Sequence, residues 1–160
     1  MNVLNNLNFS KNHLLFFVLL QPIMGRIMAI DYGQKRIGLA VTDEFQIIAT
    51  GLDTVHVKDI HNYIKDYVKR EPVVTFVVGE PFQMDDTPSE STKYIEPFVN
   101  WLKNTFPDIP VERVDERFTS QMAVQAMIDG GLKKKARRNK AMIDKISAVI
   151  ILQSYLESKI

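Results

Sequence analysis

The stretch from Arg26 to Asp43, RIMAIDYGQKRIGLAVTD, constrains the fold of this chain more than any other. Its apolar residues 27 to 30 follow one another without polar alternation, which is typical of a strand covered on both faces of a sheet. Asp31 follows this run, a turn in which Gly33 supplies freedom in φ can reverse the chain, and apolar residues from Ile37 predict a returning strand. The stretch therefore predicts a hairpin with a carboxylate at the exit of a buried strand. Because Asp also favours turns, the hairpin alone leaves open whether Asp31 has a structural or a functional role.

The remaining hydrophobic pattern predicts an α/β domain. Strands are predicted over 47–57, 73–78 and 111–114, and helices over 58–70, around 94–102, around 123–128 and over 139–158. Three strands followed by helix, strand, helix, strand, helix, helix predict a mixed five-stranded sheet, a meander followed by parallel strands, with helices on both faces. A length of 160 residues fits one domain.

Composition excludes several classes of protein. With 46% hydrophobic and 24% charged residues the chain is typical of soluble globular proteins. It has no cysteine, which excludes disulfides and thiolate metal sites and fits the cytoplasm. The apolar run 13–20 is shorter than the ~20 residues of a membrane span and precedes no small-residue cleavage site. We interpret residues 1–23 as an extension outside the fold, and residues 24–160 as a single domain without membrane association.

Three carboxylates are candidates for one site. Asp31 and Glu116 stand at the carboxyl ends of predicted strands, the edge where open α/β sheets bind ligands. Asp144 lies on the last predicted helix, on a face of small and apolar residues that should pack against the sheet. A carboxylate buried there is costly unless it is compensated. A hard cation would compensate all three, and ligands that are all oxygen favour Mg²⁺ or Mn²⁺.

Each of these acids also has a structural interpretation. Glu116 could pair with Arg117 at an exposed strand end, and Asp144 could stabilise the first half of its helix through the helix dipole. Asp115 and Asp85 are further acids that could contact the direct metal ligands without binding the metal themselves. Spacing alone does not decide between these interpretations.

A cluster of basic residues precedes the helix of Asp144. Six cations occur within eight residues: Lys133, Lys134, Lys135, Arg137, Arg138 and Lys140. Such a run is commonly a solvated loop. Beside a carboxylate site it predicts binding of a polyanion through backbone phosphates rather than bases. Lys35 and Arg36 in the first turn could add phosphate contacts.

Four segments of the chain resemble a known family. AIDYGQKRIGLAVTD (29–43), VVGEPFQMD (77–85), VDERFTS (114–120) and IDKISAVIILQSYL (143–156) are similar, in this order, to signatures of the YqgF-type Holliday-junction-resolvase-like family. The family has an RNase H-like fold, and its members are described as pre-16S rRNA nucleases. One departure is Asp86, where the family commonly has Gly. The resemblance covers about residues 25–158.

The resemblance implies a metal-dependent nuclease. Asp31, Glu116 and Asp144 would be its catalytic and metal-binding triad, and the substrate would be pre-16S rRNA or a pre-ribosomal particle. Two other readings stay open: resolution of branched DNA junctions, and RNA binding without catalysis. A phosphate-binding hairpin of the sugar-kinase class is a further alternative, but such proteins enclose a nucleotide between two lobes. The sequence does not distinguish a monomer from a homodimer.

Overall fold

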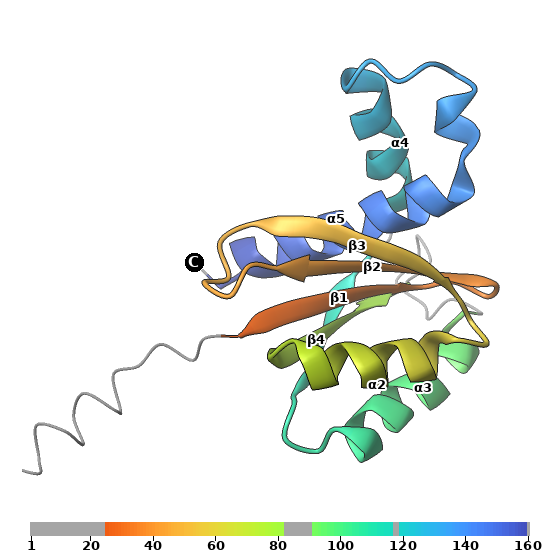
Figure 1. Ribbon diagram of the computed structural model, residues 1–160. Helices are drawn as coiled ribbons and strands as arrows, with labels where there is room; N and C mark the ends of the chain where they lie inside the picture. Colours follow the sequence, from red (N-terminus) through yellow and green to blue (C-terminus); the bar gives the residue numbers. More distant parts are fainter. Residues whose placement is uncertain (1–24, 82–90, 117–118, 160) are drawn as a thin grey trace, which may run out of the picture.

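The computed structural model describes residues 25–81, 91–116 and 119–159. Their five strands form one mixed sheet in the order β3-β2-β1-β4-β5 (Figure 1). β1 pairs antiparallel with β2 and parallel with β4, β2 pairs antiparallel with β3, and β4 pairs parallel with β5. The predicted meander followed by parallel strands is therefore confirmed. The bounds are β1 Arg26–Tyr32, β2 Arg36–Thr42, β3 Ala49–His56, β4 Val73–Glu80 and β5 Val111–Asp115.

Helices cover both faces of the sheet, as the order of elements predicted. α2 (Ile60–Arg70) and α3 (Thr92–Thr105) lie on one face, and α5 (Lys140–Glu157) lies on the other. α4 (Thr119–Asp129) packs against α5, and a short 3-10 helix, η1 (Ala136–Arg138), leads from it into α5. Figure 1 shows α4 and η1 standing away from the sheet as a projecting arm.

The apolar run of β1 contributes to two cores, one on each face of the sheet. Met28 and Ile30 belong to the core under α2 and α3, whereas Ile27 and Ala29 belong to the core under α5. Successive side chains of a strand point to opposite faces, so an unbroken apolar run is what a doubly covered strand requires. By the same alternation Asp31 faces α5.

The sheet face under α5 carries small residues. Ala29 and Ala40 belong to its core, and Gly38 and Gly51 lie where α5 contacts β2 and β3. A Cβ added at Gly38 would overlap the backbone carbonyl oxygen of Asp144, and one at Gly51 would lie 2.7 Å from Cγ of Lys145. The absence of side chains at these glycines lets α5 approach the sheet closely. This approach brings Asp144 to the sheet.

Two sequence-based boundaries and the role of one glycine need correction. β1 continues through Tyr32, so Asp31 lies inside the strand opposite Gly38 rather than after its end. Gly33 is needed for space rather than for an unusual φ, because an added Cβ would lie 2.5 Å from the Arg36 carbonyl oxygen. The third strand begins at Ala49 and not at residue 47.

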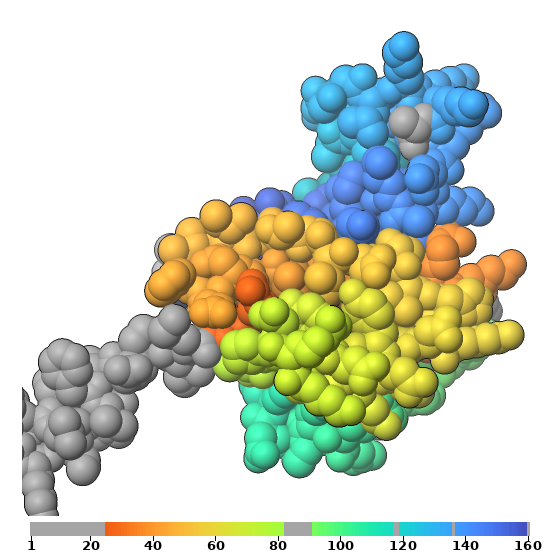
Figure 2. Space-filling view, in the orientation of Figure 1, coloured from red at the N-terminus to blue at the C-terminus, as the bar shows by residue number. Residues whose placement is uncertain are grey.

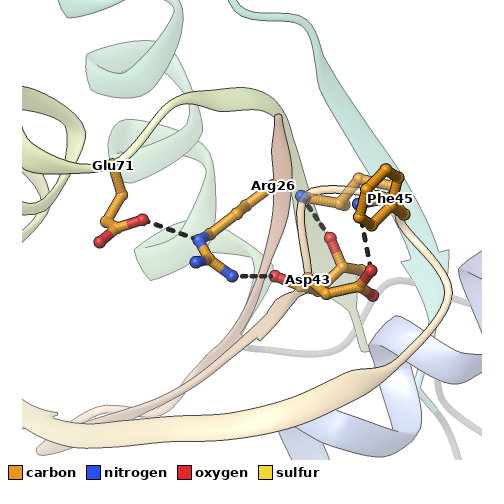
Figure 3. A network of polar contacts seen from close by, with 6 residues as sticks. Arg26, Asp43, Phe45 and Glu71 are labelled. Carbon is orange, nitrogen blue, oxygen red and sulfur yellow. Dashed lines mark hydrogen bonds and ion pairs between the residues drawn. The ribbon is translucent and has the colours of Figure 1, made fainter. Parts of the chain in front are cut away.

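The loop before β3 explains the last difference. The Asp43 carboxylate accepts hydrogen bonds from the backbone N–H groups of Phe45, Ile47 and Ile48 at 2.7–3.1 Å, which holds the chain in a turn. These bonds lower the pKa of Asp43. Figure 3 shows this turn beside Arg26, which pairs with Glu71 at 2.9 Å and fixes the start of β1. The apolar residues 47 and 48 are therefore exposed loop residues.

Several predictions fall outside the described residues. They concern the extension 1–23, the acids at 85 and 86, and Arg117. Within the described parts of the chain, no helix has the length and apolar character needed to cross a membrane.

Candidate active site

Asp31 and Glu116 meet across the sheet. Asp31 is the sixth residue of β1, and Glu116 directly follows β5, with β4 between the two strands. Gly79 of β4 provides the space, because a Cβ at that position would overlap the Glu116 carboxylate. The two carboxyl groups lie close enough for each to act on the pKa of the other. The pair therefore depends on the carboxyl ends of β1 and β5 and on a glycine, which has no side chain, in the strand between them.

The negative charges of this buried pair are not fully compensated by nearby cations of the protein, as the pKa values of both groups indicate. Burial, with repulsion from Asp144 as the second cause, raises the pKa of Asp31 to about 7. Burial, followed by the negative charge of Asp31, raises the pKa of Glu116 to about 8. Like charges that share a buried site resist ionising together, so near neutral pH the pair retains a proton. A cation between the two carboxylates would replace that proton.

Asp144 approaches the pair from α5. Its Oδ2 accepts a hydrogen bond from Nε of Arg36 at 2.8 Å, and its negative charge contributes to the raised pKa of Asp31. The first turn of α5 is fixed to the sheet by Thr54 of β3, whose hydroxyl donates to the Ala141 carbonyl at 2.7 Å. The prediction that this face of the helix packs on the sheet is confirmed. Residues 147, 148 and 151 are each no more than 1% exposed.

The donor set fits a hard divalent cation. Asp31 and Glu116 offer carboxylate oxygens from adjacent positions, and Asp144 lies close enough to act on the charge of Asp31. As the side chains are placed, no three His, Cys, Asp or Glu residues of the described regions form a metal-binding cluster. Oδ2 of Asp144 is directed to the guanidinium of Arg36.

Sequence reasoning missed two residues near the pair. Ser147, one turn after Asp144, is 1% exposed, and its hydroxyl lowers the pKa of Asp31, although no well-formed hydrogen bond joins them. Arg113 of β5 pairs with Glu96 at 2.7 Å, and its positive charge lowers the pKa of Glu116. A cation inside a short strand is a signal that could have drawn attention to Arg113.

The basic residues lie on the projecting arm and on the first turn. Lys133, Lys134 and Lys135 precede η1, Arg137 and Arg138 lie in it, and Lys140 begins α5. All are exposed except Arg137, which is partly buried. Figure 2 shows the arm standing out from the sheet domain. Of the two first-turn cations, Lys35 is exposed, whereas Arg36 is turned to Asp144.

Comparison with known proteins gives one family and many close relatives. Residues 25–158 match the family described as "RuvX: Holliday junction resolvase". A protein of Phocaeicola vulgatus named "Putative pre-16S rRNA nuclease" is 62% identical over 136 residues, which cover 85% of this chain and 98% of the relative. A protein of Flavobacterium psychrophilum with the same name is 58% identical over 137 residues, 86% of this chain and all of the relative.

A solved structure supports the fold. RuvC of T. thermophilus in complex with a Holliday junction substrate is similar with a TM-score of 0.51 at 20% identity. The similarity covers 84% of this chain and 96% of that one. The sheet order and this match agree with an RNase H-like architecture.

Proposed function

The chain belongs to the RuvX family and is a nuclease, which is a class of hydrolase, and we propose that its substrate is pre-16S rRNA, whose phosphodiester bonds it cleaves. The observation that carries the proposal is the buried pair of Asp31 and Glu116, which meet over Gly79 and whose raised pKa values call for a cation. We place the functional unit in residues 24–160, as a monomer or homodimer in the cytoplasm. The names of the close relatives support the substrate.

Asp31, Glu116 and Asp144 would hold Mg²⁺ or Mn²⁺, with Asp31 as the central ligand. Bound there, such an ion supplies Lewis-acid chemistry: it makes bound water more acidic and neutralises charge on the phosphate. In the reaction the oxygen of water bonds to phosphorus, and the bond from phosphorus to one ribose oxygen breaks. Glu116 and Asp144 orient the water. A carboxylate oxygen of Glu116 would accept the proton of the water, and the ribose oxygen that leaves would take up a proton from solvent.

The test is a cleavage assay with two substrates. The purified protein is incubated with a pre-16S rRNA fragment and with a four-way DNA junction, each with Mg²⁺, with Mn²⁺ and with chelator. We expect metal-dependent cleavage of the RNA at a defined site. Cleavage of the junction alone would favour the resolvase activity in the family description. Cleavage of neither, with RNA binding that persists in chelator, would contradict catalysis and favour a binding factor.

The basic arm is expected to bind the RNA backbone. Replacing Lys133, Lys134 and Lys135 together by Gln removes three exposed cations of the arm. Each lost phosphate contact lowers the slope of log affinity against log salt by about 0.7 for single-stranded RNA. We therefore expect weaker binding with a slope smaller by up to about 2.

The measurement is fluorescence anisotropy of a labelled RNA fragment over a range of salt concentrations. Replacing Lys58, Lys65 and Lys69 of the α2 side by Gln changes the net charge equally and is the matched control. Equal losses of affinity in the two triple variants would contradict a specific role for the arm.

A further inference from the structure

An ion pair joins a candidate metal ligand to the first turn of the sheet. Nε of Arg36 lies 2.8 Å from Oδ2 of Asp144, across 108 positions of sequence. The two side chains are 36% and 24% exposed, so the contact is partly shielded from water. It lies where Gly38 lets α5 touch β2, and Arg36 and Gly38 belong to the same face of β2. The close packing of the α5 backbone against β2 thus determines the relative positions of Arg36 and Asp144.

A divalent cation and this guanidinium compete for one carboxylate. The charge-assisted hydrogen bond from Arg36 orients the Asp144 carboxylate through Oδ2, so a cation beside Asp31 would compete with the guanidinium for this oxygen. A guanidinium close to the site also repels a divalent cation. The same positive charge stabilises Asp144 when no cation is bound. Arg36 therefore stabilises the metal-free site and opposes metal binding.

We propose that Arg36 is a positioning residue that holds Asp144 until a divalent cation takes its place, and that the released guanidinium then binds a substrate phosphate. The inference rests on the proposed function, because the cation is the one assigned there to the three carboxylates. Arg36 begins β2, directly after exposed Lys35, so its long side chain can turn towards solvent without movement of the strand. A guanidinium fork suits the paired oxygens of a phosphate.

The first test compares metal affinity in Arg36→Gln and Lys35→Gln, by calorimetry with Mg²⁺ and by electron paramagnetic resonance with Mn²⁺. We expect Arg36→Gln to bind metal roughly 5-fold or more tightly, as for an ordinary coupling between two sites. It should nevertheless cleave RNA more slowly. Lys35→Gln should leave metal affinity unchanged. A residue with a merely structural role would weaken metal binding when removed, so unchanged or weaker binding in Arg36→Gln overturns the inference.

The second test observes Arg36 directly by NMR. In metal-free protein its side-chain Nε–H signal, assigned by its loss in Arg36→Lys, should be protected by the bond to Asp144. Saturation with Mg²⁺ should shift or remove this signal, and a signal that does not change contradicts release. Both readouts are independent of cleavage. If the protein binds metal but cuts no RNA, only the proposed function fails; if it cuts RNA while Arg36 stays bound to Asp144, only this inference fails.

Discussion

Replacing Asp31 by Asn is expected to abolish cleavage while leaving the protein folded. Asp31 is the carboxylate whose pKa responds to both of the others, Glu116 and Asp144. An amide keeps the shape of the side chain but removes the charge that would bind a cation. Removing a preorganised electrostatic contact of this kind commonly lowers kcat by about 10²–10³-fold or more.

The same substitution should change the pH dependence of stability. In metal-free protein the pKa of Asp31 is raised from 3.8 to about 7, and that of Glu116 from 4.5 to about 8. The folded state then binds more protons than the unfolded state between about pH 4 and 8, so its free energy of unfolding falls as the pH rises through this range. Asp31→Asn removes one of two repelling groups. Its stability in chelator should therefore depend less on pH, and at pH 8 it should exceed that of the wild type.

Cleavage assays and urea unfolding in chelator at pH 5, 6.5 and 8 measure both effects. Asp108→Asn is the matched control, because Asp108 is exposed in the loop between α3 and β5. The control should cleave normally and keep the pH profile of the wild type. Normal cleavage by Asp31→Asn would show that Asp31 is not an active-site residue. An unfolding free energy that depends on pH as in the wild type would contradict a proton shared between Asp31 and Glu116.

The fold could be predicted from sequence because its hydrophobic pattern is locally consistent. The unbroken run 27–30 indicated a strand covered on both faces, and both faces are covered. The loop at 43–48 could not be predicted, because apolar residues there resemble a strand. What excludes them from β3 is the set of bonds from their backbone to Asp43. Such a contact between side chain and backbone overrides hydrophobic pattern.

The candidate site was predicted in part. Placing Asp31 and Glu116 at one edge of the sheet needed only the rule for strand ends, and the structure brings them into contact. The contact of Arg36 with Asp144 was not predicted, since it depends on how closely α5 approaches β2. The distance between α5 and the sheet depends on glycines, and a glycine that allows close packing produces no periodic pattern in the sequence. Besides Ser147 and Arg113, the structure adds Gly38, where α5 meets β2, and Gly79, which makes room for the Glu116 carboxylate.

Gly38→Ala is expected to destabilise the protein and to impair cleavage together. The added methyl group would overlap the backbone carbonyl oxygen of Asp144, so β2 or α5 must move. Overpacking of this kind typically costs about 1–3 kcal/mol of unfolding free energy. The smaller freedom of Ala in the unfolded chain offsets only about 0.4–1 kcal/mol of this cost. Any outward shift of α5 also moves Asp144 away from Asp31, and a displacement of ~1 Å can reduce catalysis about 10²-fold.

Urea unfolding and cleavage rates measured well below the melting temperature separate the two effects. Gly130→Ala is the control, because a Cβ at this exposed position after α4 would lie 3.3 Å from the Ala126 carbonyl oxygen, a tight contact but not an overlap. It should destabilise the protein less than Gly38→Ala and leave cleavage unchanged. If Gly38→Ala is destabilised but cleaves at the normal rate while folded, catalysis does not depend on the close contact of α5 with β2. A loss of cleavage in fully folded Gly38→Ala, at unchanged RNA affinity, would instead show that the close approach of α5 is a requirement of the chemistry.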